Sequence, residues 1–331
     1  MTETNYELLP YMVGGLLYVP AVNGGAADKI AGQVYKDLTS VAFCLEDAVM
    51  DSALGLAEQT LLESLRKIRN AENNGGDIPM LFVRVRDPGH LVHVSGMLGE
   101  LEDMLTGYIL PKFDLSNCRE YLSIIEKISA SRRRRLFAMP ILESSMIADK
   151  SGRMCVLSKL HELLFGAREY ILNVRVGGND FCNLYGLRRS VNQSIYDVGV
   201  VRDILVDILN VFARDFVVSG PVWEYFGADT GDSWAKGLRR ELELDRINGF
   251  IGKTAVHPSQ LPVIAESLKV SQADYTDALS VLGWSSGELG VEKGRGVSRM
   301  NEVKCHLKWA QRVKILGDIY GVKEDTDEKL I

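Results

Sequence analysis

The 331-residue chain is 46% hydrophobic and 25% charged, which is typical of globular proteins and is enough for one large α/β domain or two smaller ones. Its formal net charge of −6 at pH 7 argues against nucleic acid as a partner, because phosphate backbones are held by dense Lys and Arg surfaces. Five cysteines without CxxC spacing exclude a zinc ribbon, and the lack of a leader-like N-terminus or of roughly 18 consecutive apolar residues predicts a cytoplasmic protein without a membrane partner.

Eight short apolar runs are spaced along the first 258 residues, and we predict a β-strand in each. The runs are 16–21, 41–47, 80–86, 107–113, 136–144, 170–178, 216–222 and 249–258. Between them lie amphipathic stretches such as 54–73 and 200–215, in which apolar residues recur every three or four positions, as in a helix with one buried stripe. Eight β-then-α units predict a (β/α)8 TIM barrel, with a doubly wound open sheet as the alternative.

After His257 and Pro258 the pattern changes to helical segments. We therefore predict a barrel catalytic domain over 1–270 and a C-terminal helical extension over 271–331. The segment 294–310 either swings over a barrel mouth or is a plain packing helix.

Polar side chains close almost every predicted strand. In a (β/α)8 barrel the active site collects at the carboxyl ends of the strands, so these residues carry most of the functional information. In chain order they are Glu46 and Asp47, Arg84 and Arg86, Lys112, Glu143, Asn179 and Asp180, Lys253, and His257. Their convergence on one rim predicts a site of mixed charge.

Acids and bases that converge in this way fit a divalent metal ion with an anionic substrate. Mg²⁺ prefers carboxylate oxygens and keeps water and substrate oxygens in its other positions, and Mn²⁺ has similar preferences. Glu143 and Asp180, on neighbouring strands, are the candidate ligands. The alternative for each acid is a plain ion pair or a helix cap.

Three arginines on the predicted strands are candidate anion ligands. Arg84 and Arg86 share one face of their strand, because side chains alternate with period two, so both could point at the same ligand. Arg175 lies in the middle of a strand that a barrel would bury, so it should meet either a structural acid or a substrate anion.

The stretch 176–189, VGGNDFCNLYGLRR, breaks an apolar run with two glycines. We interpret the glycines as a thinned strand end that lets substrate approach the backbone, since no dinucleotide or Walker sequence follows. Cys182 is interpreted as a small buried hydrophobe and not as a nucleophile. His90 and His93 are interpreted as part of a helix N-terminal turn and not as a zinc site. Arg188 and Arg189 stay open between substrate contact and solvent-facing helix charges.

Seven of these motifs, in this order, resemble the citrate lyase β-subunit and HpcH/HpaI aldolase superfamily. The superfamily consists of magnesium-dependent (β/α)8 enzymes that make or break carbon–carbon bonds. The resemblance covers about residues 13–270 and is greatest to a C–C bond lyase branch associated with tellurium-resistance-type operons. The motifs are LLYVPA, FCLEDAV, VRVR, LPKF, PILES, GGNDF and GFIGKTAVHPSQ.

The resemblance implies roles for individual residues. It places Glu143 and Asp180 at the two Mg²⁺ ligands, and Arg84 at the arginine that holds the substrate carboxylate or the enolate oxygen. It places Glu46 and Asp47 at an acidic pair close to the metal's water ligands. The tendency of the C-terminal segments of this superfamily to cover a barrel mouth suggests a homo-oligomer, for which a trimer or a hexamer is possible.

The chain also departs from the pattern of the superfamily. Gly14 and Gly15 stand where an Arg-Ser pair usually opens strand one, and Cys44 stands where an Asp is common. Arg86 replaces a neutral amide, and Ser219-Gly220 replaces an Asp-Gly pair after strand seven. These changes argue against citryl-CoA or malyl-CoA as the substrate, and the additional arginines suggest a substrate with an extra anionic group, such as a phosphate.

The resulting hypothesis is a magnesium-dependent carbon–carbon bond lyase acting on a carboxylate-bearing keto or hydroxy acid through a metal-stabilised enolate; a phosphorylated acid and a CoA thioester are both possible substrates. A metal-bound water steered by Glu46 or Asp47 is the candidate base. Two alternatives are a catalytically silent metabolite-binding barrel within a biosynthetic assembly and a phosphoenolpyruvate-type transferase. The residues predicted to contact substrate are Arg86, Lys112, Arg175, Gly178 and Asn179.

Overall fold

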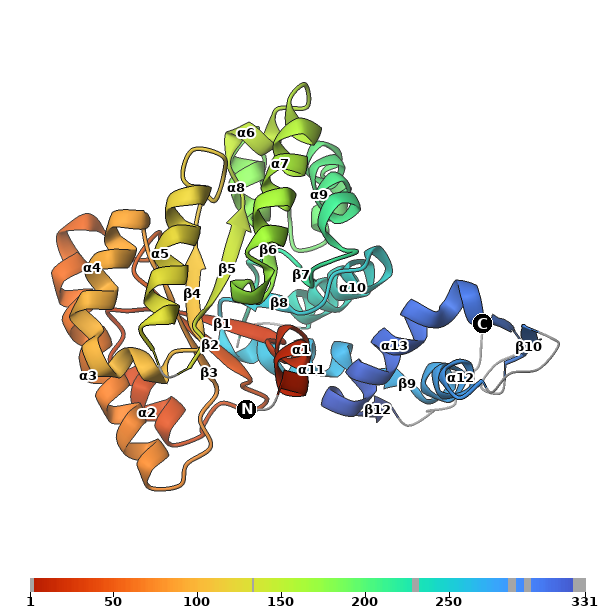
Figure 1. Cartoon of the computed structure of the whole chain (residues 1–331), viewed down its shortest axis with the longest axis horizontal. Helices are drawn as coiled ribbons and strands as arrows, with labels where there is room; N and C mark the ends of the chain where they lie inside the picture. The colour runs from red at the N-terminus through yellow and green to blue at the C-terminus, as the bar shows by residue number, and fades with distance from the viewer. Residues whose placement is uncertain (1–2, 133, 228–231, 285–289, 295–298, 324–331) are drawn as a thin grey trace. The chain divides into compact units, whose positions relative to one another are not determined.

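The computed structural model describes residues 3–132, 134–227, 232–284, 290–294 and 299–323 (Figure 1). Eight parallel strands pair in the order β7-β6-β5-β4-β3-β2-β1-β8, and a parallel bridge from Gly220 to Lys253 joins the two ends of this order. The sheet therefore closes into a (β/α)8 barrel, and the open-sheet alternative is wrong. Each predicted apolar run overlaps one strand, and β1 and β2 begin one residue before their runs. The strands are β1 Gly15–Pro20, β2 Ser40–Cys44, β3 Met80–Arg84, β4 Gly107–Leu110, β5 Phe137–Leu142, β6 Val174–Val176, β7 Val218–Ser219 and β8 Lys253–Ala255.

Helices surround the strands of the barrel (Figure 1). The amphipathic stretch predicted over 54–73 is α3 in the structure, and it buries Ala57, Leu61, Leu65 and Ile68 at the spacing of one helix face. The helices are α2 Gly25–Ala31, α3 Leu54–Asn73, α4 Pro88–Leu98, α5 Cys118–Ala130, α6 Ser145–Ala148, α7 Arg153–Gly166, α8 Gly178–Leu184, α9 Gly199–Phe212, α10 Ser233–Asn248 and α11 Leu261–Leu268. Five 3-10 turns join them: η1 Asp51–Ala53, η2 Gly99–Met104, η3 Arg168–Tyr170, η4 Ile195–Asp197 and η5 Pro258–Gln260.

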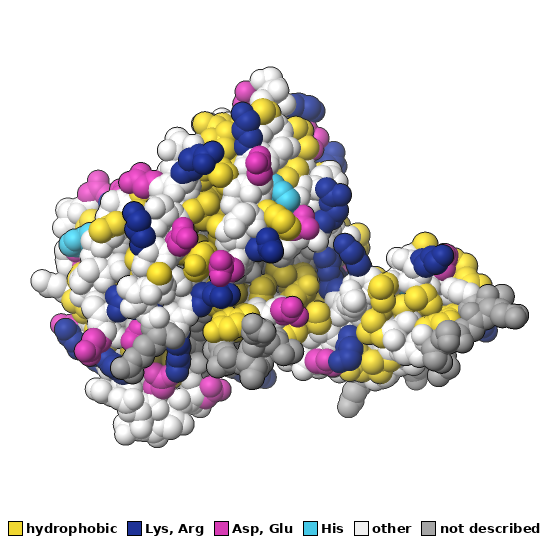
Figure 2. Space-filling model, in the orientation of Figure 1, with side chains coloured by type: hydrophobic (Ala, Val, Ile, Leu, Met, Phe, Trp, Pro, Cys, Tyr) yellow, Lys and Arg dark blue, Asp and Glu magenta, His cyan; other side chains and the backbone are white. Residues whose placement is uncertain are grey.

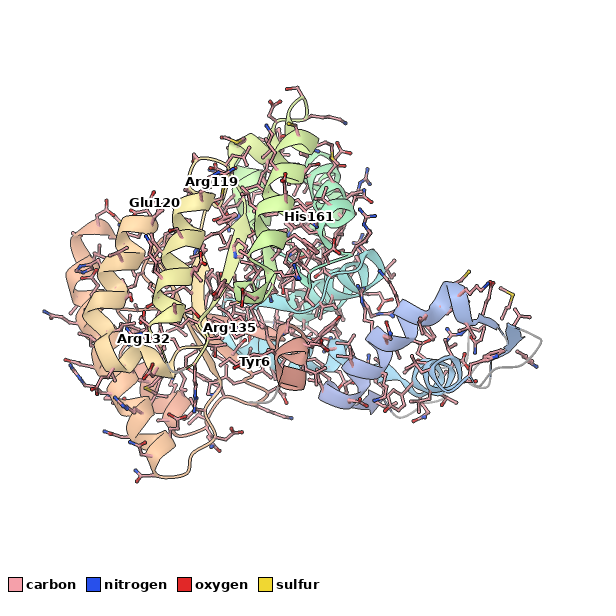
Figure 3. All side chains as sticks on the ribbon, viewed as in Figure 1. Tyr6, Arg119, Glu120, Arg132, Arg135 and His161 are labelled. Carbon is pink, nitrogen blue, oxygen red and sulfur yellow. The ribbon has the colours of Figure 1, made fainter. Side chains whose placement is uncertain are left out.

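Polar side chains on the helices pack within the outer layer of the barrel. Figure 3 labels His161 on α7, and its Nε2 atom lies 2.9 Å from Asp215 Oδ2, just beyond α9. The His161 ring packs against the rings of Phe165, Phe212 and Phe216.

On the face of the barrel drawn in Figure 2, Lys and Arg side chains are interspersed with Asp and Glu. Within the described residues, no helix combines the length and apolarity that a membrane crossing requires.

Lys253 does not lie on the rim of the barrel, where the sequence analysis placed it. It is fully buried on the helix side of β8, where its Nζ atom lies 3.0 Å from Glu241 Oε1 and 2.6 Å from Asp245 Oδ2, both on α10. Tyr196 donates to Asp245 Oδ1 at 2.7 Å. A buried charge is retained only when it is paired, so Lys253 joins α10 to the sheet. His257, also predicted on the rim, caps η5: its Nδ1 atom accepts from the N–H of Ser259 at 3.2 Å.

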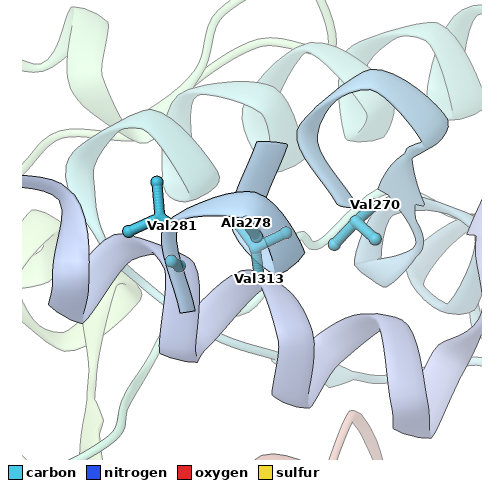
Figure 4. Packing of buried hydrophobic residues seen from close by; sticks show 5 residues of the cluster. Val270, Ala278, Val281 and Val313 are labelled. Atoms are coloured by element: carbon cyan, nitrogen blue, oxygen red, sulfur yellow. The ribbon is translucent and has the colours of Figure 1, made fainter. Parts of the chain in front are cut away.

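The chain divides into two compact units, Val13–Ile264 and Met1–Met12 with Ala265–Ile331. The sequence-based boundary counted 1–270 with the barrel, whereas α1 Glu3–Met12 groups with the C-terminal unit, in which Tyr320 donates to Tyr11 O at 2.6 Å. Two helices of this unit, α12 Gln272–Leu282 and α13 Val303–Tyr320, pack through Val270, Ala278, Val281, Ala310 and Val313 (Figure 4).

Four short strands accompany the predicted helices of the C-terminal unit. β10 Val291–Lys293 pairs antiparallel with β11 Met300–Glu302, and β12 Val322–Lys323 pairs parallel with β9 Val270–Ser271. Strands of two or three residues are too short to show a hydrophobic period in the sequence. Residues 285–289, 295–298 and 324–331 of the predicted extension lie outside the described residues.

Candidate active site

Arg84 is the centre of a group of charges at the carboxyl ends of β2, β3 and β5. Its Nη2 atom lies 2.7 Å from Glu46 Oε2, 3.0 Å from Asp47 Oδ2 and 3.5 Å from Glu143 Oε1. The N–H of Leu45 donates to Arg84 O at 3.0 Å, so the chain that leaves β2 stays beside the end of β3. The structure therefore gathers three of the predicted acids around one guanidinium.

Lys112 joins this group through both its backbone and its side chain. It has a φ of 48°, in the left-handed region that non-glycine residues rarely adopt, and Asn117 Nδ2 donates to its carbonyl at 3.0 Å. In this conformation the Lys112 N–H donates to Glu143 Oε1 at 2.8 Å. Its Nζ atom contacts Glu46 Oε1 and lies 3.3 Å from Asp47 Oδ1. Such strained backbone is found where a site is held in one arrangement.

Glu143 and Asp180 each place one carboxylate oxygen beside Gly177, and a gap separates the two oxygens. A methyl group at Gly177 would lie 2.3 Å from Glu143 Oε2, 2.4 Å from Glu143 Cβ and 3.0 Å from Asp180 Oδ2, so both oxygens lie within 3.0 Å of one point and a side chain at Gly177 has no room. The hydrogen bonds of Glu143 use its other oxygen, Oε1. Among the described residues, Glu143 Oε2 accepts no hydrogen bond and Asp180 has no ion-pair partner.

This pair of carboxylates fits a divalent cation. Two acidic oxygens that face one gap without a protein cation between them are suited to Mg²⁺, which is often held by one or two carboxylates and completes its shell with water and substrate oxygens. No third His, Cys, Asp or Glu completes a metal cage within the described part of the chain. The site would therefore leave positions open for substrate.

The electrostatics of the site favour an added positive charge near Glu143. Burial raises the pKa of Glu143, the charge of Arg84 lowers it and the charge of Asp180 raises it, and the result is a pKa of about 8. Burial also raises the pKa of Glu46 above its ordinary value. Burial alone would raise the pKa of Asp47 as well, but hydrogen bonding with Glu46 and the charges of Arg84 and Lys112 lower it. The two neighbouring acids are thus shifted in opposite directions.

Changing Gly177 to Ala is expected to weaken Mg²⁺ binding about 10- to 100-fold, because the added methyl group would overlap Glu143 Cβ and Oε2 and displace this carboxylate from Asp180. Isothermal titration calorimetry with MgCl₂ measures the effect. Gly96→Ala on α4 is the matched control, because a Cβ there would have no atom within 4 Å. Equal Mg²⁺ affinity in the two variants would contradict the placement of the ion beside Gly177.

Arg86 does not join Arg84, although the sequence analysis predicted that both would point at one ligand. Arg86 Nε donates to Leu45 O at 2.8 Å, Nη2 donates to Val49 O at 2.7 Å, and Nη1 contacts Asp51. All three guanidinium nitrogens therefore hold the loop that follows β2. Side chains alternate between the two faces of a sheet only within a strand. Because β3 ends at Arg84, this alternation does not predict the direction of Arg86.

Gly178 and Asn179, which were predicted to contact substrate, have other contacts in the structure. A Cβ at Gly178 would lie 2.8 Å from Pro221 Cβ, so Gly178 permits close packing against the chain that follows β7 and does not face the carboxylates. Asn179 Nδ2 donates to Glu224 Oε2 at 3.3 Å. Cys182 is buried, as predicted, and burial raises the pKa of its thiol.

Four basic residues outside the Arg84 group have structural partners. The exposed Arg188 lies 2.9 Å from Glu224 Oε1, and the buried Arg189 lies 3.5 Å from Glu241 Oε1. His90 lies in the first turn of α4, which confirms the predicted helix N-terminal turn. Both His90 and His93 approach a single acceptor, Glu58 Oε1, at 3.1 and 3.4 Å.

Tyr18 on β1 lies beside Arg84 and was not among the predicted site residues. The Arg84 guanidinium carbon lies 5.7 Å from the centre of the Tyr18 ring. Burial raises the pKa of Tyr18, whereas the charges of Arg84 and Arg175 lower it. One feature of the sequence could have pointed to Tyr18: it bears a hydroxyl group within an otherwise apolar strand.

A family model described as C-C bond lyase of the TIM-barrel fold matches residues 7–322 of the chain. A comparison with curated proteins found no match to this chain. Several solved structures share the fold at low sequence identity, which by itself speaks only for the architecture.

One of these structures is the protein CitE from Mycobacterium tuberculosis in complex with magnesium, acetoacetate and coenzyme A. It has a TM-score of 0.60 and 19% identity, and the match covers 92% of this chain and 98% of that one. RipC from Yersinia pestis has a TM-score of 0.56 and 16% identity, over 80% and 99% of the two chains. The citrate lyase beta subunit of M. tuberculosis complexed with oxaloacetate and magnesium has a TM-score of 0.51 and 18% identity, over 78% and 98%.

Proposed function

Because the chain belongs to the C-C bond lyase family of the TIM-barrel fold, we propose that it is a magnesium-dependent carbon–carbon lyase for a carboxylate-bearing keto or hydroxy acid. The observation that carries the proposal is the gap at Gly177, which Glu143 and Asp180 face from one side of the site and beside which Arg84 lies. Mg²⁺ was also present in the related CitE structures, together with acetoacetate or oxaloacetate.

Glu143 and Asp180 are the residues that would hold the ion, and Mn²⁺ is expected to substitute for Mg²⁺ because it accepts the same oxygen ligands. When bound, the ion supplies Lewis-acid polarisation of a substrate oxygen and stabilises developing negative charge. Lys112 keeps Glu143 in place, because its N–H holds Oε1 and leaves Oε2 directed at the gap.

Arg84 supplies positive charge where an enolate would develop. Its Nη2 atom is fixed by three carboxylates, so the guanidinium is preorganised and needs no rearrangement during the reaction. Groups of this kind act on the transition state, and removal of one donor typically lowers the rate about 10²- to 10³-fold.

In the direction of cleavage, the bond between the carbon next to the keto group and the hydroxyl-bearing carbon breaks. The electron pair of that bond forms the enolate, and the hydroxyl proton leaves as the second fragment becomes a carbonyl compound. The enolate then takes a proton on carbon, so atoms and charge balance. We propose that Glu46 and Asp47 accept and return this proton, with Lys112 beside both carboxylates.

The test measures the exchange of the methyl protons of pyruvate with D₂O. Exchange is monitored as the loss of the methyl ¹H NMR signal. Exchange is expected to require both protein and Mg²⁺, to stop with EDTA and to resume with excess Mg²⁺. Pyruvate with Mg²⁺ and no protein is the control. If Mg²⁺ binds but no keto acid exchanges its protons faster than in the control, the proposed lyase function is wrong. The alternative of a catalytically silent metabolite-binding barrel then takes its place.

A further inference from the structure

Arg175 on β6 points into the interior of the barrel. Its Nη2 atom donates to Thr254 Oγ1 at 2.7 Å, and Thr254 lies on β8, which is separated from β6 by β7 in the closed sheet. The flanking residue Lys253 points the other way, toward α10, as the alternation of β8 requires. Arg175 is 2% exposed, so its charge is almost fully removed from bulk water.

Arg175 differs from every other buried basic residue in the described part of the chain. Five basic residues are buried there, and four of them have a carboxylate oxygen within 4.0 Å: Arg84 at 2.7 Å, Arg153 at 2.7 Å, Arg189 at 3.5 Å and Lys253 at 2.6 Å. Arg175 has none; its Nε and Nη1 atoms, like those of Arg189, have no hydrogen-bond partner among the described residues. The polar groups that act on it are the Tyr18 hydroxyl and the like-charged Arg84.

An unpaired buried cation is strongly unfavourable unless an anion joins it. Tyr18 and Thr254, the two neighbours of Arg175, are each partly exposed although they lie on strands of the closed sheet. The Tyr18 ring also lies beside Arg84, so it connects the region of the metal gap with Arg175. Arg175 is therefore a buried cation with two unpartnered donors, next to two residues that solvent reaches.

We propose that Arg175, with the hydroxyl groups of Thr254 and Tyr18, binds a second anionic group of the substrate, a carboxylate or a phosphoryl group. This inference rests on the proposed function, in which the first carboxylate and the adjacent oxygen lie at Glu143 and Asp180. The substrate is thus a keto or hydroxy acid with an anionic group at each end. Arginine suits this task, because its planar fork matches both carboxylate and phosphate.

Three 2-hydroxy acids that differ only at carbon 3 test the proposal by calorimetric titration in the presence of Mg²⁺: lactate, malate and 2-hydroxy-3-phosphonopropanoate. The wild-type protein is expected to bind malate, the phosphonate or both about 10- to 100-fold more tightly than lactate, as expected for a charge-assisted hydrogen bond. Whichever of malate and the phosphonate binds more tightly identifies the second anionic group of the substrate as a carboxylate or a phosphoryl group. Arg175→Gln is expected to remove this preference, so that the three acids bind with affinities within a few-fold of one another.

Two further variants separate binding from folding. Thr254→Val removes the hydroxyl beside Arg175 and is expected to reduce the preference several-fold, whereas Thr254→Ser keeps the hydroxyl and the preference. Without ligand, Arg175→Gln is expected to melt at a higher temperature than the wild type, because it removes an uncompensated buried charge. A lower melting temperature together with an undiminished preference for the dianions would show a structural role and overturn the proposal.

The results also distinguish this inference from the function on which it rests. Mg²⁺-dependent binding of lactate with no preference for malate or the phosphonate would overturn the second anion site alone. Absence of Mg²⁺-dependent binding for all three acids would instead overturn the proposed metal-assisted function.

Discussion

Glu143→Gln and Asp180→Asn are each expected to lower Mg²⁺ affinity about 100-fold or more, and to abolish Mg²⁺-dependent proton exchange. Each change keeps the size of the side chain and replaces a carboxylate beside Gly177, which can carry the negative charge that a cation requires, by a neutral amide. Mg²⁺ binds hard, charged oxygen ligands, so a neutral amide oxygen is a poor replacement. Titration calorimetry measures the affinity, and NMR in D₂O measures the exchange.

The fold should survive these substitutions. Burial raises the pKa of Glu143 to about 8, which means that the folded protein favours the neutral form of this side chain, and glutamine is neutral. Glu243→Gln on the exposed face of α10 and Asp203→Asn on α9 are matched controls. Wild-type Mg²⁺ affinity in both Glu143→Gln and Asp180→Asn would show that the ion, if it binds, binds elsewhere.

Arg84→Gln is expected to lower both turnover and stability. The loss of turnover should be about 10²- to 10³-fold, because one preorganised cation is removed from the place where negative charge develops. The free energy of unfolding should fall by about 3–5 kcal/mol, because Glu46 and Glu143 are buried and lose their shared counter-ion. Denaturant unfolding and pyruvate exchange measure the two effects.

A double variant separates the two roles of Arg84. In Glu46→Gln/Arg84→Gln, one of the acids left unpaired is neutralised, so part of the lost stability should return while exchange stays low. Arg84→Lys keeps a positive charge and should retain more stability than Arg84→Gln. Recovery of full exchange in the double variant would show that Arg84 acts only as a structural counter-ion.

The strands and several helices could be predicted because their signals are local. Each of the eight apolar runs overlaps a strand, and the amphipathic stretch 54–73 coincides with α3. The rule that parallel strands present their carboxyl ends at one edge also brought Glu46, Asp47, Arg84 and Glu143 into one candidate set, and in the structure these four side chains are neighbours.

The errors concern the direction of single side chains. Lys253 and Thr254 are adjacent in sequence, and only the packing of α10 shows that the lysine faces the helices and the threonine faces the barrel interior. Arg86 follows the end of β3, where the strand period no longer applies, and it meets the loop after β2 instead of Arg84. Tyr18 lies within the LLYVPA motif, but no role was predicted for its side chain.

The sequence by itself determined the class of fold, the order of the strands along the chain and the set of charged residues at their carboxyl ends, because hydrophobic period and strand-end position are properties of neighbouring residues. Only the tertiary structure decided which of these charges meet. The contacts of Arg84 with Asp47, of Lys112 with Glu46 and of Arg175 with Thr254 join residues 37, 66 and 79 positions apart. Such pairs form only once the barrel has closed, and closure is also what leaves Arg175 without an acid.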